Sequence, residues 1–195
     1  GEVAAAANPL RGTIPREWEG PGLEASRYFA PPRGTFAGGC HALIIEIDRD
    51  TGAVRVDKYV VVHDCGTIIN PMILEGQIQG GVAQGIGGAF YEKLVYDGEG
   101  QLLTQTYMDY LLPTVAEVPG AEIGHIETPS PLNPLGVKGA GEAGVIAVAA
   151  AFASALDDAL GTRITEMPLS HDAVLMLLLE AGATTPTASA AGAGA

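Results

Sequence analysis

The sequence predicts an α+β domain in which β-hairpins and single strands pack with about three helices. Runs of β-branched residues separated by glycine-containing turns predict the strands, and helically spaced apolar residues after good cap residues predict the helices. No repeat of about 20–50 residues suggests a solenoid or propeller. With 195 residues, of which 47% are hydrophobic, the chain is long enough to bury a core.

The net charge and the small number of cysteines disfavour several classes of function. A net charge of −13 disfavours binding to nucleic acid or to an anionic membrane surface. Cys40 and Cys65 are too few for a disulfide framework, so we expect a reducing compartment and a cytoplasmic protein. The first residues lack the pattern of a signal peptide, and the longest apolar run, 145–156, is too short to span a bilayer.

The composition divides the chain into three parts. Residues 1–35 are rich in Pro, Gly and charge and predict an irregular arm, whose Trp18, Tyr28 and Phe29 would need something to lie against. Residues 36–181 predict the folded domain. Residues 182–195 are of low complexity and predict a disordered tail.

The first predicted element is a hairpin formed by residues 41–48 and 53–64, with Gly52 in the turn. The second strand is apolar for most of its length, which predicts a central position in the sheet. An EF-hand loop starting at Asp48 is excluded because its twelfth position is Tyr59 rather than Glu.

A glycine-rich helix follows. Asn70 is a good N-cap and Pro71 a good first residue, and the helical spacing of apolar residues continues to about Lys93. Each internal glycine should cost roughly 0.5–1 kcal/mol relative to Ala, so another element or a large ligand must approach this backbone closely. The glycines are Gly76, Gly80, Gly81, Gly85, Gly87 and Gly88.

The remaining elements predicted along the chain are a second hairpin, a strand and two helices. The hairpin turns at 97–100, and the strand near residue 123 leads into a Pro-rich loop. A helix over 145–160 should end at Gly161, and a last helix over 171–181 should be capped by Ser170 and ended by Gly182.

The segment Gly139-Ala-Gly-Glu-Ala-Gly144 matches G-x-G-x-x-G, but a dinucleotide-binding turn is excluded because the preceding Pro129, Pro131 and Pro134 cannot belong to a central strand. Two interpretations of Glu142 remain open. It either stabilises the start of a helix through the helix dipole, or it is a carboxylate held in a tight turn, with Lys138 nearby, whose pKa suits a general base.

Other groups of polar residues indicate less. Cys40-His41 and His63-x-Cys65 lack the spacing of a zinc site. Adjacent residues on a helix point about 100° apart, so Ser170-His171-Asp172 is a helix start rather than a catalytic triad. His125 is interpreted as a strand residue.

Two long motifs, residues 60–97 and 136–160, together with "ITEMPLS" at 164–170, resemble the molybdenum hydroxylase family of xanthine dehydrogenase, aldehyde oxidase and aerobic carbon monoxide dehydrogenase. The resemblance covers about residues 36–181. It implies the C-terminal molybdopterin-binding domain of the family's large subunit.

The resemblance also implies site residues. Glu142 matches the base that deprotonates a molybdenum-bound hydroxide or water, and Gln77 matches the glutamine that hydrogen-bonds the metal centre. Lys138 and Gly139 match the loop around the cofactor, and Asp64 and Cys65 match positions near its nucleotide part. No protein ligand to the metal is expected, because the pterin dithiolene holds it. On a helix Gln77, Gly81, Gln84 and Gly88 share one face, against which a dinucleotide cofactor could lie.

The cofactor implied is molybdopterin with molybdenum, in a dinucleotide form, and the partners implied are an iron–sulfur chain, an FAD chain and the remainder of the molybdenum subunit. The substrate would be an aldehyde, an N-heterocycle or carbon monoxide, with water as the oxygen source. Alone, the chain is expected to be inactive. The alternative is a non-catalytic structural or interaction domain that keeps the fold without the cofactor, but the presence of Glu142, Lys138 and Gln77 favours the enzyme.

Overall fold

The structure, a computed structural model, describes residues 1–7 and 26–184. The chain divides into two compact units, Gly1–Pro32 and Arg33–Ala195. Within the first unit, residues Glu2–Ala6 form the short helix α1. Trp18 and the predicted tail beyond residue 184 lie outside the described residues, and the predicted domain limits stay a prediction.

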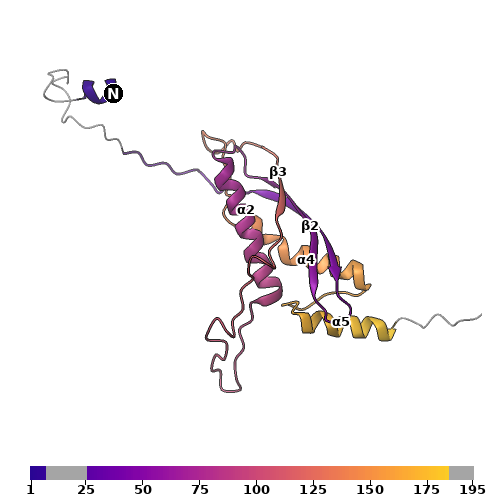
Figure 1. The fold of residues 1–195 in the computed structure, drawn as a ribbon. Coiled ribbons are helices and arrows are strands. Elements are labelled where there is room, and N and C mark those ends of the chain that lie inside the picture. Colours follow the sequence, from indigo (N-terminus) through magenta and orange to yellow (C-terminus); the bar gives the residue numbers. More distant parts are fainter. Residues whose placement is uncertain (8–25, 185–195) are drawn as a thin grey trace, which may run out of the picture. The chain divides into compact units, whose positions relative to one another are not determined.

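The second unit contains a three-stranded sheet (Figure 1). Its strands are β1, Gly38–Ile47; β2, Val54–Asp64; and β3, Ala121–His125. β2 lies in the centre, antiparallel to β1 and parallel to β3, as its apolar sequence predicts. In the turn between β1 and β2, Gly52 has a φ of +73°, and a Cβ there would lie 2.3 Å from the His171 carbonyl oxygen.

The glycine-rich helix α2, Pro71–Ile86, begins where the sequence predicts it. The side chain of Asn70 accepts a hydrogen bond from the backbone N–H of Ile73 at 3.2 Å, as expected of an N-cap. The helix continues into one π-helical turn, η2, Gly87–Tyr91. Such a turn is not visible in the apolar spacing of the sequence.

Three further helices complete the second unit. The helix predicted over 145–160 is two helices, α3, Ala143–Ile146, and α4, Val148–Leu160, separated at Ala147. Gly161, with a φ of 64°, ends α4 in the left-handed conformation. The last helix, α5, runs over His171–Thr184, so it passes through Gly182 instead of ending there.

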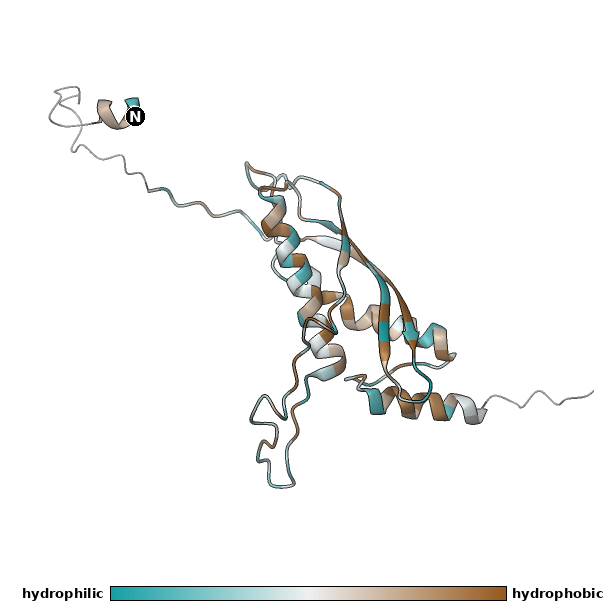
Figure 2. Ribbon diagram, in the orientation of Figure 1, coloured by the Kyte–Doolittle hydropathy of each residue, from teal (hydrophilic) through white to brown (hydrophobic). Residues whose placement is uncertain are grey.

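The helices α2 and α4 pack on one face of the sheet and enclose the core. Tyr59 and Val61 of β2 are buried there together with Ile78 of α2 and Phe152 of α4. Phe152 also meets Phe90 edge to face, with ring centroids 4.8 Å apart. Figure 2 shows hydrophobic residues along the strands as well as along the helices.

One helical stretch among the described residues, Ala143–Leu160, is long and apolar enough to cross a membrane by length and composition. It consists of α3 and α4, and Val148, Phe152 and Leu156 lie in the core. Core helices of water-soluble proteins pass the same test, so this stretch indicates little about a membrane.

The predicted second hairpin is present only as a short antiparallel pair around its turn, where the N–H of Leu103 donates to the Val95 carbonyl at 2.8 Å. Its turn is present, since the N–H of Gly100 donates to the Asp97 carbonyl at 3.1 Å, but the flanking chain forms only one isolated bridge, between Tyr96 and Leu102. A two-stranded hairpin without a sheet or helix beside it is marginal, and here the segment forms a long projecting loop (Figure 1). Its exposed apolar side chains include Leu94, Tyr96, Leu103, Tyr107, Met108 and Val115.

The glycines of the helical segment fall into two sets. A Cβ at Gly81 would lie 2.8 Å from the Cα of Gly144, and a Cβ at Gly85 would lie 2.5 Å from the side chain of Val148. A Cβ at Gly87 would meet the flexible end of the Glu92 side chain and, at 3.2 Å, the ring of Pro113. The other three, Gly76, Gly80 and Gly88, are exposed and have nothing within 4 Å of a Cβ.

The two sets predict opposite effects of the same substitution. Gly81→Ala should lower the free energy of unfolding by about 1–3 kcal/mol, because its Cβ would press on the backbone of α3. Gly80→Ala, on the open side of the same helix, should raise it by roughly 0.5–1 kcal/mol through helix propensity. Urea unfolding of the two variants measures both changes, and equal effects would contradict the close contact between α2 and α3.

Candidate cofactor-binding site

Glu142 lies at the N-cap position of α3 and is exposed. Its carboxylate makes no capping hydrogen bond, and only its backbone carbonyl takes part in the turn, accepting from the N–H of Val145 at 3.0 Å. The carboxylate is therefore not used as a cap, although its place at the start of a helix agrees with the dipole interpretation as well.

A backbone contact brings α3 against α2. Gly144 and Gly81 face each other, and a Cβ on Gly144 would lie 2.6 Å from the carbonyl oxygen of Ile78. Glu142 lies only two positions before Gly144. The sequence-predicted base therefore lies at the border of the glycine-rich helix.

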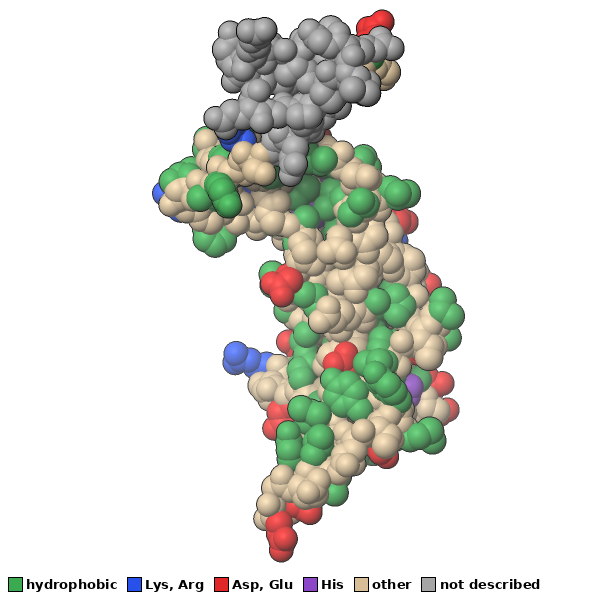
Figure 3. All heavy atoms as spheres, turned by 90° about the vertical axis from the view of Figure 1, so that its left-hand side faces the viewer, with side chains coloured by type: hydrophobic (Ala, Val, Ile, Leu, Met, Phe, Trp, Pro, Cys, Tyr) green, Lys and Arg blue, Asp and Glu red, His purple; other side chains and the backbone are tan. Residues whose placement is uncertain are grey.

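The exposed side of α2 and of the turn η2 that continues it forms what we name the open stripe, whose members follow helical spacing: Gly76, Gln77, Gly80, Gln84 and, in η2, Gly88. The sequence predicts Gly81 on this face, which is wrong, because Gly81 is buried against α3. Figure 3 views the molecule from the side on which α2 lies, and shows areas of backbone and uncharged polar side chains bordered by hydrophobic patches.

The glutamines of α2, like its glycines, divide into those that contact the rest of the fold and those that are exposed. The side chain of Gln79 is fully engaged, since its amide NH2 donates to the Pro119 carbonyl at 2.8 Å and its carbonyl accepts from the N–H of Ala121 at 3.0 Å. It fastens α2 to the start of β3. Gln77 and Gln84 are exposed on the open stripe, so their amides are accessible to a ligand.

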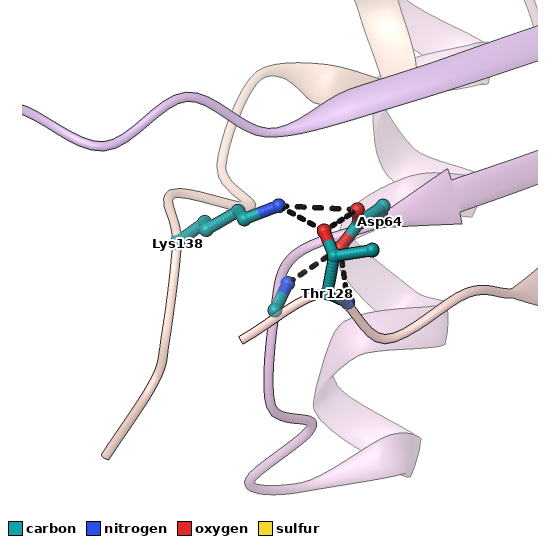
Figure 4. A network of polar contacts seen from close by, with 4 residues as sticks. Asp64, Thr128 and Lys138 are labelled. Atoms are coloured by element: carbon teal, nitrogen blue, oxygen red, sulfur yellow. Dashed lines mark hydrogen bonds and ion pairs between the residues drawn. The ribbon is translucent and has the colours of Figure 1, made fainter. Parts of the chain in front are cut away.

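Asp64 is the centre of a polar network at the end of β2 (Figure 4). Its carboxylate accepts the N–H of Gly66 at 2.8 Å and the ammonium of Lys138 at 3.1 Å, and it accepts both the N–H and the hydroxyl of Thr128. The Thr128 hydroxyl, followed by these other donors, holds the pKa of Asp64 well below its ordinary value.

This network, which we name the Asp64 clasp (Asp64, Gly66, Thr128 and Lys138), joins three distant segments. The N–H of Lys138 also donates to the Cys65 carbonyl at 2.7 Å. Because Lys138 lies four positions before Glu142, the clasp fixes the loop that carries the predicted base. The charge of Lys138 is paired with Asp64, and the predicted contacts of both with a cofactor stay predictions.

The glycine that this loop requires for its own folding is Gly136 rather than Gly139. Gly136 has a φ of +71°, and a Cβ there would lie 2.8 Å from both Pro129 and the hydroxyl of Thr67. Gly139 is exposed with nothing within 4 Å of a Cβ, as is Gly141. The space at Gly139 agrees with a ligand-facing position but does not test it.

Cys65 is 6% exposed and belongs to the hydrophobic core. Burial raises the pKa of its thiol, so the thiol stays protonated and unreactive at neutral pH. The structure thus gives Cys65 a packing role, and its predicted contact with the cofactor stays a prediction.

Three histidines lie on the helix-covered face of the sheet. His63 is paired with His125 in register, and His41 Nδ1 lies 2.9 Å from the Tyr59 hydroxyl. Burial lowers the pKa of His63 and of His41, and a neighbouring histidine lowers each further. A backbone hydrogen bond with Ala143, at the start of α3, raises the pKa of His41 and so partly offsets this decrease.

These histidines do not form a metal site in the part of the chain that the structure describes, where no group of three or more metal-binding side chains is found. The ring nitrogens of His63 and His125 have no hydrogen-bond partner among the described residues. The sequence did not reveal the pairing of His63 with His125 or the role of Thr128. For the histidine pair, the one indication in the sequence is that each residue lies near the end of a predicted strand.

The exposed acid therefore borders a helix whose open glycines and exposed amides leave room for a large ligand. The molybdopterin cofactor-binding domain family matches residues 1–119. The chain belongs to this family, as a molybdenum-binding domain of molybdenum hydroxylase large subunits. The family match includes Gln77 and Asp64 but ends before Lys138 and Glu142.

Individual relatives agree with the family. The chain is 48% identical to the nicotine 6-hydroxylase large subunit of Paenarthrobacter nicotinovorans, over 80% of this chain and 19% of that protein. It is 41% identical to the carbon monoxide dehydrogenase large chain of Hydrogenophaga pseudoflava, over 77% of this chain and 19% of that one.

Solved structures share the fold. The Cu,Mo-CO dehydrogenase aligns with a TM-score of 0.82 at 35% identity, covering 94% of this chain and 23% of that one. Quinoline 2-oxidoreductase from Pseudomonas putida 86 aligns with a TM-score of 0.80 at 45% identity, covering 92% and 23%. The chain therefore spans about a fifth of the length of these relatives.

The Asp64 clasp predicts a pH-dependent contribution to stability. The pKa of Asp64 in the folded state is below its ordinary value of 3.8, so its ionised form stabilises the fold. This contribution is fully present above the ordinary value and is lost as the pH falls through the lower folded-state pKa. Asp64→Asn should therefore lower the free energy of unfolding at neutral pH, and the deficit should shrink as the pH falls below about 4.

Urea unfolding between neutral and acidic pH measures the deficit. Asp158→Asn, which removes a carboxylate from the exposed side of α4, is the matched control and should show little deficit at any pH. A deficit for Asp64→Asn that is the same at all pH values would show that the clasp does not depend on the ionised carboxylate.

Proposed function

We propose that the chain forms one wall of a molybdenum cofactor site and supplies Glu142 as the general base of an oxidative hydroxylation. The observation that carries the proposal is the contact between Gly81 and Gly144, which brings Glu142 to the border of the open stripe of α2. Membership of the molybdopterin cofactor-binding family supports the cofactor site, although not the role of Glu142 itself.

The residues present fit a large bound group. Three glycines of the open stripe have free space where a side chain would be, so a flat group could approach the helix backbone. Gln77 and Gln84 offer amides that donate and accept hydrogen bonds, and Glu142 offers a carboxylate that makes no capping bond. We assign Gln77 to the metal centre, and Lys138, Gly139, Asp64 and Cys65 to the surroundings of a dinucleotide form.

When bound, the molybdenum cofactor supplies the two-electron oxidation of a substrate carbon. Overall, a C–H bond and a water molecule are converted to a C–O bond with release of two protons and two electrons. Glu142 takes a proton from the attacking water, which makes the oxygen a better nucleophile. The Asp64 clasp and the Gly81–Gly144 contact hold the backbone of the loop that carries this carboxylate, which limits how far the loop must move during the reaction.

The electrons need a route to an acceptor, and we assign it to iron–sulfur and FAD chains in a cytoplasmic complex. One relative, 39% identical over 89% of this chain, is named as subunit gamma of a dehydrogenase complex. For the substrate we favour an N-heterocycle over an aldehyde or carbon monoxide. The relatives at 48% and 45% identity are named for nicotine and quinoline, which are both nitrogen heterocycles.

The base assignment predicts the effect of Glu142→Gln in the natively purified complex. Turnover should fall by a factor of about 100 or more, as expected for loss of a general base, while molybdenum and pterin content stay unchanged. Metal analysis and steady-state kinetics measure the two quantities. Glu99→Gln, in the exposed loop, is the control and should keep full activity.

Two results would count against the proposal. Activity within tenfold of the unsubstituted complex would remove Glu142 from the role of base. A native complex that contains no molybdenum would favour the alternative, a structural domain that keeps the fold without the cofactor.

The two glutamines predict a separation between cofactor binding and stability. Gln77→Ala should lower the molybdenum content or slow turnover while leaving the melting temperature unchanged, because its exposed amide serves the ligand. Gln79→Ala should lower the free energy of unfolding by roughly 1 kcal/mol, because it leaves half-buried backbone groups at Pro119 and Ala121 unpaired. If Gln77→Ala changes neither cofactor content nor turnover, Gln77 does not contact the bound group.

A further inference from the structure

The sheet has a second apolar face, opposite to the one that packs on α2 and α4. The β1–β2–β3 register brings Cys40, Val62 and Gly124 into one row and Ala42, Val60 and Glu122 into the next. Since alternate residues of a strand point to opposite faces, and Tyr59, Val61 and His63 face the helices, these rows face away from them. We name the outer sheet face after its apolar members: Cys40, Ala42, Ile44, Val60, Val62 and Gly124.

Described parts of the chain leave this face open. Cys40, Ala42 and Ile44 are exposed, Ile44 to 58%, and Val60, Val62 and Gly124 are only half-buried. A strand in a sheet with one wet face alternates apolar and polar residues, whereas Val60, Val61 and Val62 are consecutive. The parallel pairing of β2 with β3 is also typical of sheets covered on both faces.

The charges that flank the outer sheet face are already paired within the chain. Lys58 binds Glu122 at 3.0 Å at one end of the face, in the rows of Ile44 and Ala42, and Lys138 binds Asp64 at 3.1 Å beyond the other end. A partner therefore needs no complementary charge and is expected to be apolar. A second copy of this chain is disfavoured, because each copy carries a net charge of −13.

We propose that the outer sheet face is the surface on which the remaining part of a molybdenum hydroxylase large subunit packs. In the solved relatives this fold makes up only 23% of one chain, so most of each of those subunits lies outside it. The proposal rests on the family membership and not on the role of Glu142, so either one can fail without the other.

Cys40, near the start of the edge strand β1, is a reporter on this surface. The chain has only one other cysteine, Cys65, which is buried in the core and serves as an internal control. In the isolated chain a maleimide should modify Cys40 and leave Cys65 unmodified. In the full large subunit, whether one polypeptide or an assembly, modification of Cys40 should slow by about tenfold or more, since a packed interface excludes the reagent.

Mass spectrometry after a timed reaction gives both rates, and Cys40→Ser should abolish the signal. Equal rates in the isolated chain and the full subunit would overturn the proposal. Protection already present in the isolated chain would overturn it too. If deletion of residues 1–32 removed that protection, the outer sheet face would be covered by that segment. If dilution removed it, the face would be covered by a second copy of the chain.

A pair of matched substitutions provides a second readout. Ala42→Glu places a charge on the outer sheet face, and Ala150→Glu places one on an exposed position of α4. Both positions are exposed, so both variants should fold and give the same circular dichroism spectrum. Ala42→Glu should reduce the yield of the full large subunit severalfold relative to Ala150→Glu, and equal yields would contradict the proposed surface.

Discussion

The architecture of the candidate site depends on one backbone contact, that between Gly81 of α2 and Gly144 of α3. Neither position has room for a Cβ, so the two helices approach more closely than side chains would allow. This contact turns the glycine-rich helix into a support for the short helix that begins at Glu142. The Asp64 clasp holds the other end of the same loop, and together the two fix the loop at both ends.

Local chemistry made several elements predictable from the sequence. Asn70-Pro71 predicts the start of α2, Gly52 a turn and the valine-rich run of β2 a central strand, because each depends on neighbouring residues only. The extent of the second hairpin was not predictable. How far the pairing near Leu103 continues is decided by the rest of the fold, and here it ends after one bridge in a projecting loop.

The site was predictable in part. Residue types and spacing indicated Gln77 and Glu142, but not which glycines serve packing and which leave open space, because Gly80 and Gly81 are neighbours in sequence with opposite surroundings. The partnership of Asp64 with Lys138 spans 74 positions, and that with Thr128 spans 64, so no local pattern reveals either. The outer sheet face could not be predicted from the sequence either, because its apolar residues come together only when the three strands pair in register.

The most direct measurement of the central claim is an experimental structure of the full large subunit with its molybdenum cofactor bound. We predict that the bound group lies along the open stripe, in contact with the Gln77 amide, with the Glu142 carboxylate facing its metal. A structure in which polypeptide covers the open stripe and the cofactor contacts neither residue would contradict it.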